Sequence, residues 1–121
     1  ERSYDLHFGA GLGGGLRAEL AAALARGRKV VLVTDANVAR AQAGLLDALA
    51  GGAEGASGAA PRLVLPAGEG TKCVAELGRV WDFLAAERVD RSSLLVAVGG
   101  GVIGDLAGFA AASYLRGVEF V

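Results

Sequence analysis

Leu94-Leu95-Val96-Ala97-Val98-Gly99-Gly100-Gly101-Val102-Ile103-Gly104-Asp105 is the stretch that decides the fold of this chain. It opens with an uninterrupted apolar run, Leu94 to Val98, which is typical of a strand buried on both faces of a parallel sheet. The glycines that follow let the backbone turn sharply and approach a ligand without an intervening Cβ atom. A helix that begins at Gly104 and Asp105 would direct its unpaired N–H groups and the positive end of its dipole at that ligand. The stretch therefore predicts an anion site, suited to a pyrophosphate, at the end of a central strand.

Strands and helices are expected to alternate on either side of this stretch. The expected strands lie at residues 4–8, 29–34, 62–65, 94–98 and from 118 onward, and the expected helices at 12–25, 38–49, 72–87 and 105–114. Such alternation predicts an α/β fold, a doubly wound and mostly parallel sheet with helices on both faces. Residues 4–8 alternate apolar and polar side chains, so this strand is expected to lie half exposed at an edge. The sequence GGAEGASGAA at residues 51–60 has no periodicity and is interpreted as a flexible surface connection within one domain.

The composition limits which binding partners and which cellular location are expected. The chain has 121 residues, a net charge of -1, one cysteine and one histidine. It has no basic face, so neither nucleic acid nor a membrane surface is expected as a partner. No apolar run approaches the roughly 18 residues of a membrane span, and a lone cysteine excludes an internal disulfide, so a cytoplasmic location is expected. Because the sequence lacks an initiator methionine and stops within a strand-like pattern, we expect residues 1–121 to be one truncated domain of a longer protein.

The pattern G-x-G-x-x-G occurs twice. One copy comprises Gly9, Gly11 and Gly14, and the other Gly99, Gly101 and Gly104. The first copy follows a candidate strand and has Asp35 about 20 residues on, as in ordinary dinucleotide-binding folds. That strand carries polar side chains on one face, however, and burying them without partners would cost on the order of 1 to 3 kcal/mol each. We therefore favour the second copy, which follows a wholly apolar strand but lacks the usual acidic residue downstream.

Local explanations compete with a binding role at the other polar positions. Asp35 and Asn37 are suited to capping the helix that follows them, and Asp105 is suited to stabilising the N-terminus of its own helix. From the residues alone, Glu69 and Lys72 are interpreted as a solvated pair on a first helical turn.

Other residues near these motifs are given structural roles. Thr71 is expected to cap the helix that begins at about Lys72. Cys73, at the start of that helix, is interpreted as a buried structural cysteine rather than an activated thiol. His7 is alone on an exposed strand face, so neither a metal nor a general-base role is expected. The alternative for Gly99–Gly104 is that they only let a helix pack closely on a strand.

Four consecutive blocks of the chain carry a resemblance to a known family. They are VVLVTDANV at residues 30–38, LPAGEGTK at 65–72, VWDFLAAERVDRSSLLVAVGGG at 80–101 and GGGVIGDLAGFAAASYLRGVEFV at 99–121. In order and spacing these blocks resemble the 3-dehydroquinate synthase family, and the G-D-L-A-G-F run followed by Y-L-R-G is far more specific than the glycines alone. The resemblance covers residues 2–121 and implies the N-terminal, NAD-binding and Rossmann-like part of that enzyme.

The resemblance implies roles for the residues that match the family's motifs. Asp35 and Asn37 would hold the adenosine end of NAD, Glu69 and Lys72 would contact its adenosine and ribose side, and the segment from Gly100 onward would line the pyrophosphate. In chain order, the implied cofactor-binding residues are Asp35, Asn37, Gly68, Glu69, Lys72, Gly100, Gly101, Val102, Ile103, Gly104 and Asp105. Arg116 matches a family arginine that helps bind the phosphate of the substrate, and binding across a dimer interface is one option. The planar guanidinium group suits the geometry of a phosphate.

For the full-length protein, the resemblance implies conversion of 3-deoxy-D-arabino-heptulosonate 7-phosphate to 3-dehydroquinate and phosphate, in the shikimate pathway of aromatic amino acid biosynthesis. NAD would oxidise one substrate alcohol transiently, and a divalent metal, zinc or cobalt, would polarise the resulting carbonyl. The metal ligands belong to a later part of the family. We therefore expect no catalytic and no metal-binding residue within this chain, and a homodimer for the full-length enzyme.

Three alternatives stay open from the sequence. Another sugar-phosphate cyclase, such as one making a valiolone or scyllo-inosose skeleton, would share most of these motifs. A glycerol-type dehydrogenase would share the architecture but carry a different helix after the glycine turn. A non-catalytic nucleotide-binding module would need only the fold. The runs I-G-D-L-A-G and Y-L-R-G favour the dehydroquinate branch.

Overall fold

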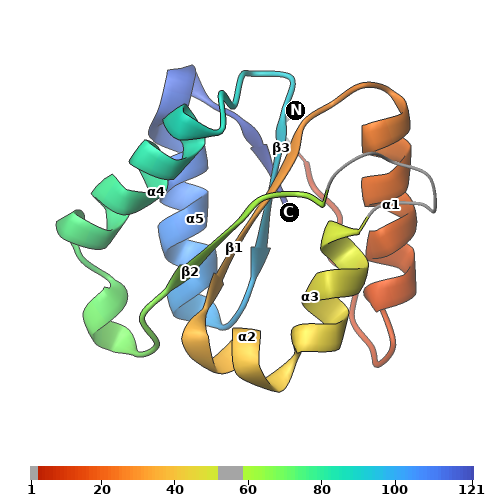
Figure 1. The fold of residues 1–121 in the computed structure, drawn as a ribbon, viewed down its shortest axis with the longest axis horizontal. Coiled ribbons are helices and arrows are strands. Elements are labelled where there is room, and N and C mark those ends of the chain that lie inside the picture. The colour runs from red at the N-terminus through yellow and green to blue at the C-terminus, as the bar shows by residue number, and fades with distance from the viewer. Residues whose placement is uncertain (1–2, 52–58) are drawn as a thin grey trace.

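The computed structural model describes residues 3–51 and 59–121, which form a four-stranded parallel sheet between two layers of helices (Figure 1). The strands are β1 (Val30–Asp35), β2 (Arg62–Leu65), β3 (Leu94–Val98) and β4 (Glu119–Phe120). The α-helices are α1 (Gly13–Ala25), α2 (Ala36–Ala41), α3 (Ala43–Ala50), α4 (Val74–Ala86) and α5 (Gly101–Ser113), and the short 3-10 turns are η1 (Glu69–Thr71) and η2 (Tyr114–Arg116). The predicted α/β class and the parallel sheet are confirmed.

The sheet has the strand order β2-β1-β3-β4, so β1 and β3 occupy its centre. The register pairs Val30 with Leu94 and Thr34 with Val98 across β1 and β3, and Asp35 with Leu65 across β1 and β2. Both central strands are apolar because each is covered by helices on its two faces. The predicted central position of Leu94–Val98 is therefore confirmed.

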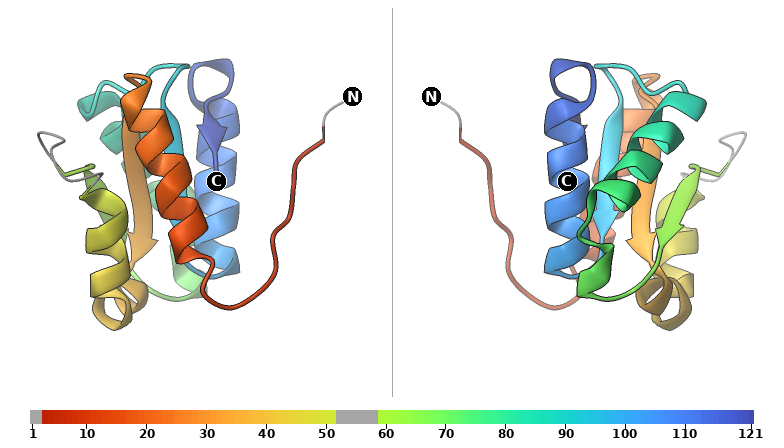
Figure 2. Two further views of the ribbon diagram at one scale, coloured as in Figure 1. Left: turned by 90° about the vertical axis from the view of Figure 1, so that its right-hand side faces the viewer. Right: turned by 90° about the vertical axis from the view of Figure 1, so that its left-hand side faces the viewer.

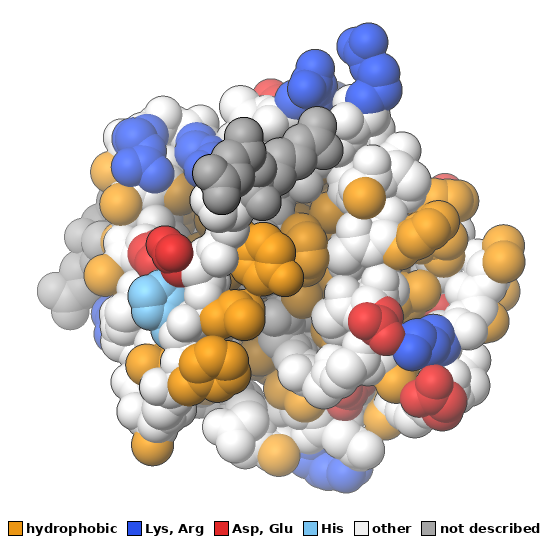
Figure 3. All heavy atoms as spheres, turned by 180° about the vertical axis from the view of Figure 1, so that it is seen from behind, with side chains coloured by type: hydrophobic (Ala, Val, Ile, Leu, Met, Phe, Trp, Pro, Cys, Tyr) orange, Lys and Arg blue, Asp and Glu red, His pale blue; other side chains and the backbone are white. Residues whose placement is uncertain are grey.

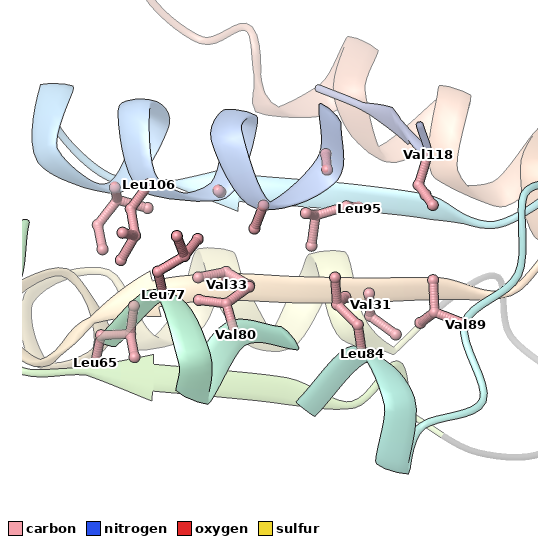
Figure 4. Close-up of a cluster of buried hydrophobic side chains, with 14 residues drawn as sticks. Val31, Val33, Leu65, Leu77, Val80, Leu84, Val89, Leu95, Leu106 and Val118 are labelled. Carbon is pink, nitrogen blue, oxygen red and sulfur yellow. The ribbon is translucent and has the colours of Figure 1, made fainter. Parts of the chain in front are cut away.

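Two hydrophobic layers hold the helices on the sheet. On one face, Leu77, Val80 and Leu84 of α4 pack with Val31 and Val33 of β1 (Figure 4). The same layer takes in the small side chains of α5, Ala107, Ala110 and Ala111, all fully buried. On the other face, Leu20 and Ala23 of α1 pack with Leu46 and Leu49 of α3 and with β-strand residues Val30, Leu32, Leu94 and Val96. Helices on both faces give the doubly wound arrangement that the sequence predicts.

The predicted edge strand at residues 4–8 is wrong. Residues 3–8 form no strand, and the side chains of Tyr4 and Phe8 are 82% and 87% exposed. The alternation of polar and apolar residues was real, but a strand also needs a hydrogen-bonding partner, and this segment runs apart from the sheet (Figure 2). A hollow of about 820 Å³, lined among others by Leu6, Phe120 and Val121, separates it from β4. Apolar side chains gather around this side of the molecule beside the single histidine (Figure 3).

The helix predicted at residues 38–49 is two helices. Asp35 caps α2, which starts at Ala36, and the chain leaves helical geometry at Gln42 (φ -125°, ψ 32°) before α3 begins. Gly44 lowers the helix propensity at this place, which a count of apolar spacings does not register. The connection predicted at residues 51–60 falls mainly on residues 52–58, which lie outside the described residues.

Hydrogen bonds of Arg28 hold the amino ends of β3 and β4. Its Nε donates to the Ser92 carbonyl at 2.6 Å, and its Nη2 donates to the Glu119 carboxylate at 2.7 Å. In the turn before β3, the Asp90 carboxylate accepts hydrogen bonds from the Ser92 and Ser93 hydroxyls. These bonds hold the pKa of Asp90 below its ordinary value.

Within the described ranges, no helix has the length and apolar character that a membrane crossing requires.

Candidate functional site

The carboxyl ends of three strands meet at one edge of the sheet, the lower edge in Figure 1. Asp35 ends β1, Leu65 ends β2 as its register partner, and Val98 ends β3 opposite Thr34. Neighbouring strands lie about 4.8 Å apart, so the segments that follow them start close together. In open parallel sheets, ligands bind outside this edge. The polar residues that the sequence singles out follow these three strand ends.

Helix α5 begins at Gly101, four residues before the predicted start at Asp105. Gly100 is its N-cap residue, with extended backbone (φ -83°, ψ -169°) and no capping side chain. Its first backbone hydrogen bond runs from Gly104 N to the Gly100 carbonyl at 3.1 Å. The N–H groups of residues 101–103 precede that bond and lie at the positive end of the helix dipole. Gly100 is therefore the N-cap and Gly101 the first helical residue, a backbone arrangement that suits an anion.

The glycines of this turn differ in what surrounds them. A Cβ atom on Gly99 would lie 2.7 Å from the Ile103 Cβ, so Gly99 is required for packing. A Cβ on Gly100, Gly101 or Gly104 would meet no atom within 4 Å. Close packing of helix on strand therefore explains Gly99 alone. The Ile103 side chain is buried in the core, which leaves only its backbone facing the site.

Asp35 and Asn37 lie at the end of β1. The Asp35 Oδ1 accepts hydrogen bonds from the N–H groups of Asn37 at 2.8 Å and Val38 at 2.9 Å, so the capping role is confirmed for Asp35. Asn37 is exposed, and its Oδ1 accepts from Arg40 at 2.9 Å. Both capping hydrogen bonds go to Oδ1 of the Asp35 carboxylate. A carboxylate at this edge is suited to accept from ribose hydroxyls.

The loop after β2 is shaped by Thr71. The prediction that Thr71 caps the next helix is wrong: its buried hydroxyl donates to the Pro66 carbonyl at 2.6 Å, and Cys73 occupies the N-cap position of α4. The reason is the intervening turn η1, which the apolar spacing of α4 does not reveal. Gly68 begins this turn with φ +104°, a conformation that L side chains rarely adopt.

Lys72 joins this loop to α5. Its Nζ lies 2.6 Å from the Asp105 Oδ2 and 3.7 Å from the Glu69 Oε1. The hydrogen bond and charge of Asp105, followed by the charge of Glu69, raise the pKa of Lys72. The predicted solvated pair of Glu69 and Lys72 exists, but the closer partner is Asp105 on another element. Asp105, the fifth residue of α5, acts through this ion pair rather than at the helix N-terminus.

The prediction of a buried Cys73 is wrong, because its side chain is exposed. It lines a hollow of about 400 Å³ between α4 and α5, together with Lys72, Val74 and Phe109 among others. The apolar face of α4 turns Val80 inward and leaves Val74 80% exposed, which places the helix start at the surface. Among the described residues, no three His, Cys, Asp or Glu side chains are grouped as a metal site would need.

The first glycine motif has no strand in front of it. Residues 3–8 are irregular, and Gly13 and Gly14 belong to α1. The strand-turn-helix context that gives this pattern its meaning is present at Gly99–Gly104, after β3.

Arg116 is not brought to this edge. It lies in η2 beyond the C-terminal end of α5, with exposed side chain and φ +65°. The 13 residues of α5 span about 20 Å, which separates Arg116 from the glycine turn of the same chain.

Thr34 is a residue at the site that the sequence reasoning missed. It is fully buried, and its Oγ1 donates to the Val98 carbonyl at 2.7 Å. The signal was a hydroxyl side chain that directly follows the apolar run Val30–Val33 and directly precedes Asp35.

Comparisons with known proteins agree on one family. Residues 62–121 match the family model described as 3-dehydroquinate synthase N-terminal. Proteins named 3-dehydroquinate synthase are similar to the chain at 48% identity in Opitutus terrae, covering 98% of this chain and 31% of theirs, and at 52% in Paracoccus denitrificans, covering 99% and 32%. The chain thus spans about a third of the length of these relatives.

Solved structures give the same fold. A 2-epi-5-epi-valiolone synthase from Streptomyces hygroscopicus, with NAD+ and Zn2+ bound, is 27% identical with a TM-score of 0.72, covering 99% of this chain and 32% of that one. A 2-deoxy-scyllo-inosose synthase complexed with carbaglucose-6-phosphate, NAD+ and Co2+ is 24% identical with a TM-score of 0.60, over 77% of this chain and 24% of that one. The second likeness concerns the fold alone.

We expect Gly99→Ala to lower the free energy of unfolding by about 1 to 3 kcal/mol, because its Cβ would overlap Ile103. Gly100→Ala is the matched control: its Cβ enters open space and its φ of -83° is accessible to alanine, so only the weaker N-cap preference of alanine acts and the loss should stay below about 1 kcal/mol. Urea unfolding followed by the fluorescence of Trp81 measures both. Equal losses for the two variants would contradict the distinction between the glycines.

We expect Asp105→Asn to lower the pKa of Lys72 toward its ordinary value, because the closest carboxylate is removed. Glu69→Gln should lower it less, because that carboxylate is 3.7 Å away. The raised pKa means that the ion pair is intact below the ordinary lysine pKa and is lost as the pH rises through the folded-state value. NMR titration of the Lys72 side chain measures each shift. A larger effect of Glu69→Gln would show that the link to α5 is not dominant.

Proposed function

Because the chain belongs to the 3-dehydroquinate synthase family, we propose that it forms the NAD-binding part of such an enzyme. The observation that carries the proposal is the glycine turn at the end of β3, where the first N–H groups of α5 have no intrahelical partner and a Cβ on Gly100 or Gly101 would meet no atom within 4 Å. Backbone N–H groups with a helix dipole behind them are suited to a pyrophosphate. The residues present therefore fit the cofactor.

In this proposal each strand end contributes one part of the site. Gly100, Gly101 and the backbone at Val102 and Ile103 bind the pyrophosphate. The other proposed contacts come from Asp35 and Asn37 after β1, from Gly68, Glu69 and Lys72 after β2, and from Gly104 and Asp105 on α5. Asp35 and Asn37 hold the adenosine end, and Glu69 and Lys72 hold its ribose side. The Lys72–Asp105 ion pair keeps the loop after β2 beside the glycine turn.

The activity of the whole protein is proposed from the family. It would convert 3-deoxy-D-arabino-heptulosonate 7-phosphate to 3-dehydroquinate and phosphate, with NAD supplying transient hydride transfer and a divalent metal bound outside this chain. Two related synthases, described above with NAD+ and with Zn2+ or Co2+, support this assignment of cofactors. This chain's own residues bind and orient the cofactor at the sheet edge, and they supply no metal ligand in the proposal.

Arg116 is proposed to bind the phosphate of the substrate in the site of a second copy of the protein. Its position beyond the far end of α5, about 20 Å along the helix from the glycine turn, supports action across an interface rather than within one chain. A homodimer of the full-length enzyme is part of this proposal. The guanidinium provides the planar pair of donors that phosphate recognition uses.

A second candidate is another sugar-phosphate cyclase. The similarity to a valiolone synthase structure, at 27% identity, supports this second candidate. Relatives named 3-dehydroquinate synthase are 48% and 52% identical over nearly the whole chain, which favours the dehydroquinate branch.

We expect NAD to shift the backbone amide signals of Gly100, Gly101 and Val102 saturably in the 15N-labelled chain. Gly100→Val should weaken the affinity by about tenfold or more, because the side chain enters the proposed pyrophosphate position. Gly14→Ala, in the first glycine motif, is the control and should change the affinity less than twofold. Shifts centred on residues 9–14 would move the site to that motif. No saturation by about 10 mM NAD, a binding free energy weaker than about -3 kcal/mol, would refute the proposal.

We expect the 121-residue chain alone to release no phosphate from 3-deoxy-D-arabino-heptulosonate 7-phosphate in the presence of NAD and Zn2+ or Co2+. The reason is that the proposed metal and substrate-carboxylate ligands lie outside it. A colorimetric phosphate assay, with the Paracoccus denitrificans 3-dehydroquinate synthase as positive control, measures this. Release above the protein-free rate would show that the chain holds catalytic groups of its own.

A further inference from the structure

Thr34 is a buried polar side chain next to the glycine turn, and it is absent from the set of residues proposed to touch the cofactor. It has no exposed surface and follows Val30 and Leu32 on the face of β1 that packs against α1 and α3. Its hydroxyl donates one hydrogen bond, to the Val98 carbonyl at 2.7 Å. A hydroxyl taken from water into an apolar layer is costly unless such a bond compensates it.

The bond to Val98 acts on the place where the chain leaves the sheet. Val98 is the last residue of β3, and only Gly99 and Gly100 separate it from the first residue of α5. Because the peptide group is planar and trans, fixing the Val98 carbonyl also fixes the direction of the Gly99 N–H. The Ile103 side chain covers the position where a Gly99 Cβ would lie. The Thr34 bond and the Ile103 contact together set the entry into the helix.

Consecutive glycines need such a constraint. Glycine has more accessible backbone conformations than any other residue, so a run of three has little intrinsic preference for one turn. A pyrophosphate cradle works only if its N–H groups converge before the ligand arrives, because ordering them on binding would reduce the affinity. Valine has the shape of threonine and would suit the apolar layer, but it could not hold the carbonyl.

We propose that Thr34 is a positioning residue that orders the glycine turn for the pyrophosphate of the cofactor. The proposal rests on the proposed function, because it assumes that NAD binds at this turn. Thr34 itself touches neither the cofactor nor the substrate. It acts through the Val98 carbonyl, and its substitution should therefore change the turn without removing any ligand contact.

Two variants of the 121-residue chain separate positioning from packing. Thr34→Val keeps the shape and removes the hydroxyl, and we expect its NAD dissociation constant to rise roughly tenfold. Thr34→Ser keeps the hydroxyl and removes a buried methyl group, and we expect its dissociation constant within twofold of wild type but a lower melting temperature than that of Thr34→Val. If Thr34 had only a structural role, the variant with the lower melting temperature would also bind NAD more weakly. A positioning role instead predicts that Thr34→Val binds NAD more weakly than Thr34→Ser although it melts at the higher temperature.

Hydrogen exchange of the amides at residues 99–101, measured without NAD, provides a readout that does not depend on the ligand. We expect faster exchange in Thr34→Val and wild-type rates in Thr34→Ser. Unchanged exchange together with unchanged NAD affinity in Thr34→Val would overturn the proposal, and so would affinity losses that follow the melting temperatures of both variants. If the wild-type chain binds no NAD, the proposed function fails, and the exchange rates alone then decide whether Thr34 orders the turn.

Discussion

The contact between Gly99 and the side chain of Ile103 is the constraint on which the rest of the structure depends. Only two residues separate the central strand β3 from helix α5, and at that distance the first turn of the helix lies directly on the strand end. Only glycine fits there, because a Cβ would come within 2.7 Å of Ile103. Small residues along the inner face of α5 continue this close approach down the helix. The same short connection places the start of α5, with N–H groups that have no intrahelical partner, at the carboxyl edge of the sheet.

Side chains from the neighbouring strand ends surround this backbone site without filling it. Asp35 caps the helix after β1, Thr71 orders the loop after β2, and Lys72 ties that loop to Asp105 on α5. These interactions are local except the last, which bridges two elements far apart in sequence. The site is therefore mostly backbone in character, and its polar side chains hold the surrounding loops in place.

The sequence predicts the regular parts of this fold because their signals are local. The apolar runs at Val30–Val33 and Leu94–Val98 have one reading, a strand buried on both faces, and the structure has them side by side. Local sequence patterns fail where the structure of a segment depends on a partner that is distant in sequence. Residues 4–8 carry the right alternation but lack a neighbouring strand, and Lys72 finds a carboxylate 33 positions away that no spacing rule would pair with it. The start of α5 was missed because three glycines read as a turn, although tertiary packing makes the third of them helical.

Ile103 belongs to the core and to the first turn of the helix that faces the site. Folding free energy and ligand affinity are thus linked through one side chain. A ligand that binds only the folded chain at 100 times its dissociation constant stabilises that chain by about 2.7 kcal/mol. In the reverse direction, loosening the layer beneath α5 lowers the population of chains with an ordered turn, so a substitution deep in the core can weaken binding without touching the ligand.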